Sequence, residues 1–478
     1  MINPWALFSF FLFFIITLIF LSEFFYKKNF LNPQIFRAII HSLVGIGVSI
    51  SPFIFENFFQ PIFLAIIFFS INLFSYKNNQ LKSFHNVNRD SLGTILFPIS
   101  FIILAIPFWE NKYFISSSFL ILAISDPLAS IVGNYYKKAH FYRISKEIKS
   151  IEGSLIMFLS TSSILVLLSG NIFNGFNIIN SIIAILLCSL FITISESIST
   201  KGSDNLSIPL TAFIFIEMFN YLNELKTIIQ FSLIISIIIC ILFYFYRKNH
   251  LSLSGFLSAS LMATLITGLG GLSYLIPIII FFISSTVISK LGQSTKHKSS
   301  INRSVSQVIS NGGIPLLICI INHFYQYDIL YLAFLASVAA ANSDTWGTEI
   351  GKFSNVKPVD IISRITLRKG ESGGVTNVGL LGSVIGSFLI CISGYLFINN
   401  LKYVFLISIS GFFGAIFDSI LGSTLQGRFI SGDGLKISEE KKDNNYLITG
   451  VNIFNNDAVN LCCTLSAPIF LLLINYYL

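Results

Sequence analysis

The sequence predicts an all-α integral membrane protein with about 14–16 transmembrane helices in two related helical bundles. Mean hydropathy is +0.78. Hydrophobic residues make up 54% of the 478 positions and charged residues only 11%. No polar segment is long enough to bury a core of its own. Together these features are typical of a polytopic membrane protein.

Each predicted helix corresponds to an apolar stretch long enough to cross a hydrocarbon core, which takes about 20 residues. Several stretches could begin or end a few residues earlier or later, because polar residues such as serine and asparagine occur near their ends. The sixteen predicted stretches are 5–26, 38–55, 58–76, 94–109, 113–133, 153–171, 178–195, 206–223, 227–246, 253–270, 272–289, 305–322, 329–347, 375–398, 403–423 and 458–477.

Lysines and arginines are concentrated in alternate connections. If the N-terminus lies outside, all of them except Lys112, Lys226 and Lys402 fall on the cytoplasmic side. Such a bias follows the positive-inside rule. The sequence therefore predicts cytoplasmic motif loops, and the net charge of +8 does not indicate nucleic-acid binding.

The first cation, Lys27, follows the first stretch, which predicts a retained anchor and not a cleaved signal. Without an Arg-rich transit segment, a bacterial inner membrane is favoured over a plastid membrane. The six cysteines and six histidines show no disulfide or zinc spacing. No obligate protein partner is indicated.

Two halves share one order of features, with a seam near Glu217 and Glu224 that divides the chain into 1–224 and 225–478. In each half an aspartate ends an apolar stretch, a basic connection follows, and a Glu-Gly or Glu-Ser-Gly-Gly turn opens the next stretch. A second acid and an Asx-rich element come later. This order predicts two paralogous modules in one chain.

The first copy begins at Asp126, and Glu152 follows 26 residues later. Its other candidate residues are Gly133, Lys149, Gly153, Glu196, Lys201, Asp204 and Asn205.

The second copy begins at Asp344, 218 residues after Asp126, and Glu371 follows 27 residues later. Its other candidate residues are Asn311, Gly312, Gly351, Lys352, Lys369, Gly373, Gly374, Asp418, Asn456 and Asp457.

These residue types suit phosphate chemistry at a membrane surface. Carboxylates bind Mg²⁺, which in turn binds nucleotide phosphates. Lysines and backbone N–H groups exposed by glycines bind the remaining phosphate oxygens. Phosphoryl transfer needs mainly positioning and charge neutralisation. A lipid alcohol, with its tail in hydrocarbon and its hydroxyl among the headgroups, is the acceptor that such a site predicts.

Simpler interpretations exist for each motif. Asp126 and Asp344 could be helix caps, ion-pair partners or members of a proton or ion relay. Glu152 and Glu371 could only favour helix starts, and the Asx pairs could be turns. Gly312-Gly313 interrupts an apolar stretch, which predicts either a broken helix that lines a cavity or a kink.

The first half resembles the polyprenol kinase group that includes phytol kinase and dolichol kinase and is related to the phosphatidate cytidylyltransferases. The matching segments are Arg37-x-x-x-His41, Gly93 to Pro98, Ser125 to Gly133, Lys149 to Ser154, and Glu196 to Pro209. Asn134 stands where that family has a basic residue, with Lys137 and Lys138 close behind.

The second half resembles the membrane family that contains phytyl-phosphate kinase, and its motifs are the more specific. The matching segments are Ser306 to Gly313, Ser343 to Lys352, Gly370 to Val375, Asp418 to Gln426, and Asn455 to Asn460.

The two resemblances imply a bifunctional isoprenoid salvage kinase. The N-terminal half would phosphorylate a prenol such as phytol or geranylgeraniol, with CTP as donor. The C-terminal half would convert the monophosphate to the diphosphate with a nucleoside triphosphate. The fusion would raise the concentration of the intermediate at the second site.

The resemblances also imply roles for the motif residues. The catalytic set would be Asp126, Glu152, Glu196, Asp344, Glu371 and Asp418, and the Mg²⁺ ligands would be Asp126, Asp204, Asp344 and Asp457. Substrate or nucleotide would contact Gly133, Lys149, Gly153, Lys201, Asp204, Asn205, Asn311, Gly312, Gly351, Lys352, Lys369, Gly373, Gly374 and Asn456.

Two other functions fit parts of the pattern. A tandem-repeat transporter would place its acids near mid-helix, whereas here they adjoin basic connections. A CDP-lipid synthase-like cytidylyltransferase would carry His-Gly-Gly followed by an Asp-Arg pair, which this sequence does not contain.

Overall fold

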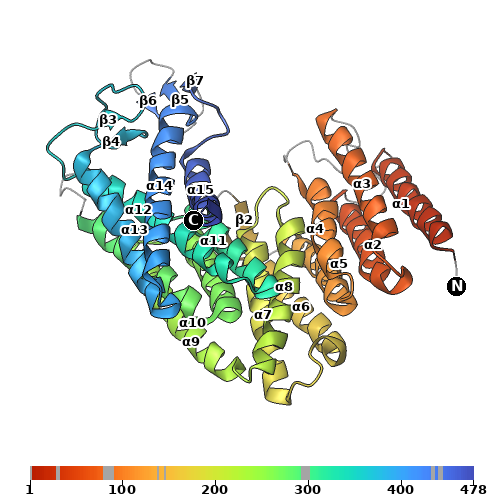
Figure 1. The fold of residues 1–478 in the computed structure, drawn as a ribbon. Helices are drawn as coiled ribbons and strands as arrows, with labels where there is room; N and C mark the ends of the chain where they lie inside the picture. The colour runs from red at the N-terminus through yellow and green to blue at the C-terminus, as the bar shows by residue number, and fades with distance from the viewer. Residues whose placement is uncertain are drawn as a thin grey trace. The chain divides into compact units, whose positions relative to one another are not determined.

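The computed structural model describes residues 3–27, 33–78, 91–136, 139–144, 147–291, 302–431, 437–439 and 445–477. The described residues form 15 α-helices and seven short strands (Figure 1), which confirms the all-α membrane class. The chain divides into two compact units, Met1–Leu233 and Ile234–Leu478. The division lies nine residues beyond the seam at 224/225 that the sequence predicts.

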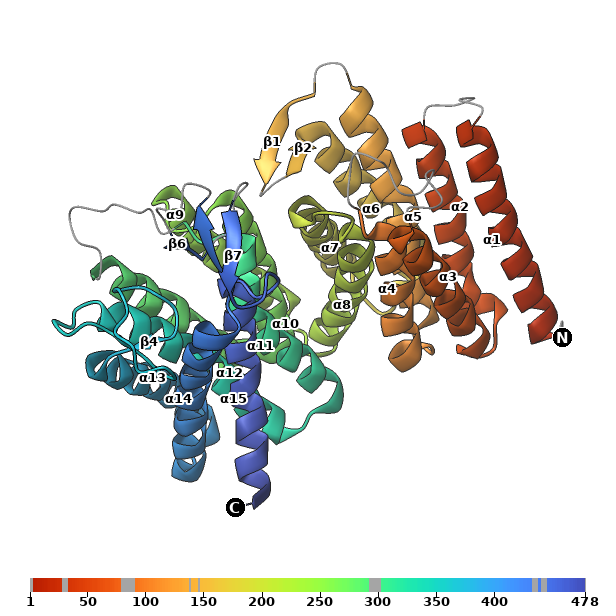
Figure 2. The same ribbon diagram turned by 90° about the horizontal axis from the view of Figure 1, so that it is seen from above.

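The first unit contains eight helices, one β-hairpin and the start of a ninth helix. Its elements are α1 (Pro4–Lys27), α2 (Pro33–Ile54), α3 (Phe59–Lys77), α4 (Gly93–Phe108), α5 (Lys112–Tyr135), β1 (Phe141–Ile144), β2 (Glu147–Ser150), α6 (Ile151–Ile172), α7 (Ile178–Ile198), α8 (Asp204–Glu224) and α9 (Ile228–Arg247). Helices α1, α2 and α3 lie side by side in both views (Figures 1 and 2).

The second unit has the rest of α9, six further helices and five short strands. Its elements are α10 (Leu253–Leu291), α11 (Val305–Tyr325), α12 (Asp328–Gly351), β3 (Val359–Asp360), β4 (Gly374–Val375), α13 (Asn377–Ile398), α14 (Leu401–Thr424), β5 (Arg428–Ser431), β6 (Ile437–Ser438), β7 (Asn445–Thr449) and α15 (Asn456–Tyr477). Strands β3 and β4 pair antiparallel, and β5 pairs with both β6 and β7.

Thirteen of the described helices are long and apolar enough to span a membrane. Of the other two, α4 is apolar but has only 16 residues. Helix α12 is less apolar for a different reason, because every residue from Leu332 to Ser343 is buried within the protein. Its many alanines let neighbouring helices approach closely, and it packs against α10, α11, α13, α14 and α15. A helix enclosed by protein need not present an apolar surface to lipid.

Helix α10 joins two of the predicted stretches, 253–270 and 272–289. It has 39 residues, or about 58 Å at 1.5 Å per residue, which exceeds a hydrocarbon core of about 30 Å. Gly271 interrupts it with a φ of 69°, a conformation that residues with a Cβ rarely adopt. The two stretches therefore meet at a glycine kink without a separate loop.

Of the two alternatives predicted at Gly312-Gly313, a broken helix or a kink, the broken helix is wrong, because α11 is helical throughout Val305–Tyr325. Each glycine costs a helix only about 1 kcal/mol. A Cβ at Gly312 would collide with the Met262 sulfur on α10. This glycine therefore permits close helix packing.

A corresponding set of elements occurs in each unit. Helix α5, the β1–β2 hairpin, α6, α7 and α8 follow one another in the first unit. In the second unit the sequence is α12, the β3–β4 pair, α13, α14 and α15. Both α5 and α12 pack against the first and last of the three helices that follow them. Each unit thus brings the end of one helix, a short β pair and the starts of two others to one site.

Candidate functional site

The site of the first unit surrounds Asp126 near the C-terminal end of α5. This carboxyl group interacts electrostatically with Asp204, Glu196, Lys149 and Arg37. These residues come from α8, α7, β2 and α2, so five separate segments meet at one place. The structure thus brings together Asp126, Lys149, Glu196 and Asp204 as the sequence predicts, and adds Arg37.

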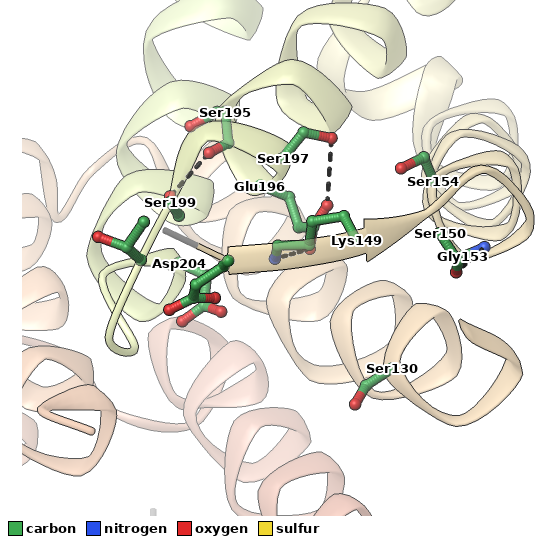
Figure 3. Close-up of polar contacts among 12 residues, drawn as sticks. Ser130, Lys149, Ser150, Gly153, Ser154, Ser195, Glu196, Ser197, Ser199 and Asp204 are labelled. Atoms are coloured by element: carbon green, nitrogen blue, oxygen red, sulfur yellow. Dashed lines mark hydrogen bonds and ion pairs between the residues drawn. The ribbon is translucent and has the colours of Figure 1, made fainter. Parts of the chain in front are cut away.

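Lys149 and Glu196 form the central ion pair, with 2.5 Å between Nζ and Oε1 (Figure 3). Their side chains are only 17% and 9% exposed. Burial alone would lower the pKa of Lys149, but the Glu196 carboxylate outweighs it and the pKa is raised. Lys149 therefore stays protonated and holds a positive charge among the carboxylates.

Hydroxyl groups connect the hairpin to α6 and α7. Tyr142 Oη lies 2.6 Å from Ser154 Oγ and 3.1 Å from Ser197 Oγ. The Ser197 hydroxyl donates to Glu196 Oε2 over 3.4 Å. This network fixes the hairpin that carries Lys149 against the helix that carries Glu196.

Asp204 begins α8 beside this pair (Figure 3), and Asn205 follows it in the chain. Both the backbone N–H and the side-chain amide of Asn205 donate to Asp204 Oδ1 over 2.9 Å. Lys201 precedes them with a left-handed φ of 52°, and its N–H donates to Glu147 Oε1 over 2.7 Å. The Lys201 backbone is thereby fixed to the hairpin.

The spacing of Glu152 to Asp126 predicts that both carboxylates belong to one site, but Glu152 has a different environment. Its carboxylate lies 2.7 Å from His140 Nδ1 and accepts the His140 backbone N–H. It is not among the charged groups that act on Asp126 in the described residues. It closes the base of the hairpin.

Gly133 and Gly153 lie where α5 and α6 pack closely. A Cβ at Gly153 would lie 3.0 Å from the Ala129 carbonyl oxygen and 3.4 Å from Gly133 Cα. This packing accounts for both glycines. Lys137 and Lys138 lie outside the described residues.

In the second unit the candidate site is a cavity of about 610 Å³. The predicted residues that line it are Asn311, Gly312, Asp344, Gly351, Lys352, Lys369, Glu371, Gly373, Gly374, Asp418 and Asn456. Asp457 is not among the described lining residues, whereas Asn456 and Asn460 are. The loops and helix ends of the second copy therefore enclose a single space.

Asp344 and Asp418 are the acidic centre of this cavity. The two side chains interact with each other from α12 and α14. Asp418 Oδ1 is buried without a hydrogen-bond partner among the described residues. A buried carboxylate oxygen in this state is costly unless a cation or a donor binds it.

Lysines border the acidic centre. Lys352 Nζ pairs with Glu349 Oε1 over 2.8 Å. Lys369 Nζ donates to the carbonyl oxygens of Ser354 over 2.6 Å and Lys352 over 3.3 Å. Lys369 thus ties the loop to the end of α12, and both lysines line the cavity.

The glycine-rich turn is held against α14. Gly373 has a φ of 82°, and a Cβ there would lie 2.8 Å from Ser423 Cα, so no other residue fits without rearrangement. Next to it, the N–H and hydroxyl of Ser372 donate to Glu439 over 2.9 and 2.8 Å. Gln426 also donates to Glu439.

Two charged cavity residues, Arg303 and Glu439, lie outside every motif that the sequence analysis identified. Burial lowers the pKa of Arg303 to about 10, so it remains charged at neutral pH, and it donates to Ser285 Oγ over 3.0 Å. Glu439 adjoins a second glutamate in a charged segment. Nothing in the local sequence distinguishes either residue.

Mg²⁺ is the ion that the sequence resemblance implies. Among the described residues, no group of three or more His, Cys, Asp or Glu side chains is arranged to hold a metal alone. Mg²⁺ in nucleotide sites is commonly held by one or two carboxylates together with substrate phosphates. The Asp344–Asp418 pair, with its unpartnered oxygen, fits that ligand set.

We expect Lys149→Met to destabilise the protein by about 3 kcal/mol, because it leaves the buried Glu196 carboxylate without its cation. The double variant Lys149→Met/Glu196→Gln should recover most of this loss. The measurement is the free energy of unfolding in detergent micelles.

The control is Lys352→Met, which removes a lysine that is 38% exposed. An exposed pair of this kind contributes at most about 1 kcal/mol. Equal losses in the two single variants would contradict the assignment of Lys149–Glu196 as a buried structural pair.

We expect the loop that carries the glycine turn to depend on ionised Asp360. This carboxylate accepts hydrogen bonds from the N–H groups of Ile362 and Ser363 and from the Ser423 hydroxyl. Burial raises its pKa, but these bonds outweigh burial and the pKa is lowered. The stabilisation is therefore present above the unfolded pKa of about 3.9 and is lost as pH falls through the lower native pKa.

Hydrogen exchange tests this expectation. Asp360→Asn should speed exchange of the Ile362 and Ser363 amides at neutral pH by about tenfold, as expected for weakening a charge-assisted hydrogen bond. Asp328→Asn is the control, because Asp328 lies in the first turn of α12 and the loop that carries Asp360 follows the last turn of that helix. Unchanged protection in Asp360→Asn would refute the role of this carboxylate.

The fold and the sites define a multi-pass α-helical membrane protein with a cluster of acidic and basic side chains in each of two units. The chain belongs to the DUF92 family of integral membrane proteins, whose profile matches residues 236–468. The match lies within the second unit.

Two relatives are covered almost completely by about half of the chain. An uncharacterized membrane protein, MJ0933, of Methanocaldococcus jannaschii is 30% identical over 53% of this chain and 97% of its own length. Protein PGR of Arabidopsis thaliana is 28% identical over 49% of this chain and 93% of its own length. No solved structure matches the chain.

Proposed function

We propose that the protein is a lipid-alcohol phosphotransferase with one site in each unit. The first unit would convert an isoprenoid alcohol to its monophosphate, and the second would convert the monophosphate to the diphosphate. The order of the two steps rests on the sequence resemblances. The membrane family and the helical fold support a function at a lipid bilayer.

The observation that carries the proposal is the composition of the cavity in the second unit. The cavity is lined both by Asp344, Asp418 and Lys352 and by the apolar side chains of Ile241 and Phe282. Its volume of about 610 Å³ falls within the range of small-molecule sites. A lipid phosphate has this polarity, with an anionic head and an apolar tail.

The charged part has the groups that phosphoryl transfer needs. Lys352, Lys369 and Arg303 would attract the phosphates of the lipid and of the nucleotide. Mg²⁺ held by Asp344 and Asp418 would neutralise charge on the transferred phosphoryl group. An acceptor oxygen of the lipid would bond to the terminal phosphorus while that atom's bond to the nucleotide breaks, releasing a nucleoside diphosphate.

The first unit would use Asp126, Glu196 and Asp204 around Lys149 in the same way, with a free hydroxyl as acceptor. The Lys149–Glu196 pair holds one cation at a fixed place among carboxylates. We further propose that both sites face the cytoplasm in a bacterial inner membrane, with CTP as the donor for the first unit. The clustering of lysines and arginines in alternate connections supports that orientation.

The direct test incubates the purified protein in lipid bilayers with radiolabelled geranylgeraniol, Mg²⁺ and each nucleoside triphosphate. We expect monophosphate to appear first and diphosphate later. A transporter would move the alcohol without changing it, and a cytidylyltransferase would release pyrophosphate and form a CMP adduct. Either outcome would refute the kinase proposal.

A further inference from the structure

The first unit contains another pocket, of about 170 Å³, lined by residues of α1, α2, α3 and α4. Most of its wall is apolar, formed by side chains such as Phe14, Leu18, Val48, Ala65 and Phe101. Its polarity suits a hydrocarbon chain.

One end of this pocket is polar. Arg37, His41, Asn72 and Asn205 contribute to it, and the Asn72 side chain is already bound to the Thr94 carbonyl oxygen. Asn205 is the neighbour of Asp204 at the start of α8. The pocket therefore ends beside the carboxylate cluster around Asp126.

His41 is the informative residue at that end. Its Nε2 atom is buried without a hydrogen-bond partner among the described residues. The ring also hydrogen-bonds to the Leu122 backbone. Because Nε2 has no partner, Nδ1 is the atom that makes this bond. A neutral imidazole that donates through Nδ1 has Nε2 free as an acceptor.

His41 also connects the pocket to the charged site. It interacts electrostatically with Asp204 and Arg37, and both of these residues act on Asp126 as well. A hydroxyl bound at Nε2 would therefore lie at the junction of the apolar pocket and the carboxylate cluster.

We propose that this pocket binds the hydrocarbon tail of the lipid alcohol and that His41 Nε2 accepts a hydrogen bond from its hydroxyl. The inference rests on the proposed function, for which it names the place of the acceptor. In this arrangement the distance from His41 to the apolar end of the pocket determines which chain lengths of alcohol bind.

Chain-length selection is tested by filling the apolar end. Ala65 is 8% exposed and lines the pocket, whereas its neighbour Ile66 is 46% exposed and does not. Ala65→Phe should weaken binding of a twenty-carbon alcohol by about tenfold, as expected when two methylene groups are excluded. A ten-carbon alcohol should bind as in the natural protein, and Ile66→Phe should change neither.

Binding is measured without nucleotide, by photocrosslinking of geranylgeraniol that carries a diazirine at its tail. We expect adducts on α1–α4 and their loss in Ala65→Phe. Adducts confined to other helices, or equal losses for both chain lengths, would overturn the assignment. Folding of the Ala65→Phe variant is checked separately, by its thermal unfolding in detergent, which should match that of the natural protein.

The hydroxyl contact is tested by comparing geranylgeraniol with its methyl ether, which cannot donate a hydrogen bond. The natural protein should prefer the alcohol by about fivefold, the worth of one hydrogen bond. His41→Phe should remove this preference while still binding the ether. A preference that survives in His41→Phe would refute the role of Nε2.

These outcomes separate the two proposals. A protein that binds the alcohol in this pocket but never phosphorylates it would refute the proposed function alone. If the protein phosphorylates alcohols but Ala65→Phe changes the binding of long and short alcohols equally, the tail site alone would be refuted.

Discussion

Asp344→Asn will stop the reaction at the monophosphate, with diphosphate formation reduced by at least about 100-fold, as for loss of an electrostatic contact to a transition state. Asp344 and Asp418 form the acidic centre of the cavity in the second unit. The asparagine keeps the shape of the side chain but removes the charge that would hold Mg²⁺ with Asp418. The first site, in the other unit, is unchanged. The measurement is the ratio of diphosphate to monophosphate formed from labelled alcohol.

The matched control is Asp328→Asn on the same helix. Asp328 is an exposed residue in the first turn of α12 and does not line the cavity. It should leave the product ratio unchanged. Full diphosphate formation by Asp344→Asn would show that this cavity is not the second site.

Asp126→Asn will prevent the first product from forming, again by at least about 100-fold. Asp126 is the carboxyl group on which Asp204, Glu196, Lys149 and Arg37 all act. When monophosphate is supplied, this variant should still make diphosphate at the rate of the natural protein, because the second unit is untouched. The measurement is product formation from each of the two substrates in turn.

Glu110→Gln serves as the control for the first unit. Glu110 is exposed and immediately precedes α5, at the end of the helix opposite to Asp126. Its replacement should leave both reactions intact. If Asp126→Asn lost both reactions while remaining folded, the two units could not be independent sites.

Most of the helices could be predicted from the sequence, because a run of about 20 apolar residues has few alternatives in a membrane protein. The sequence also predicts α12, as the stretch 329–347, although its residues from Leu332 to Ser343 face protein and its composition is less apolar. The continuity of α11 through Gly312-Gly313 could not be read from the sequence. Met262 of α10 occupies the space beside Gly312, so a Cβ there would collide with the Met262 sulfur.

Candidate site residues could be predicted from the sequence where they lie near helix ends in an order that both halves repeat. Asp126, Glu196 and Asp344 are examples. Glu152 has the expected spacing, but it pairs with His140 because the hairpin between them brings the two together. Arg303 and Glu439 reach the second site from distant segments, where only tertiary packing places them. Arg37 reaches the first site from α2, and only the resemblance to the polyprenol kinase group points to it.

The central claim, two independent sites in one chain, is tested most directly by mixing. Asp126→Asn and Asp344→Asn proteins are placed in the same bilayers with labelled geranylgeraniol, Mg²⁺ and nucleoside triphosphate. Neither variant alone should make diphosphate from the alcohol, and the mixture should, because monophosphate made by one diffuses to the intact second unit of the other. A mixture that makes no diphosphate, or a single variant that makes it unaided, would contradict the account.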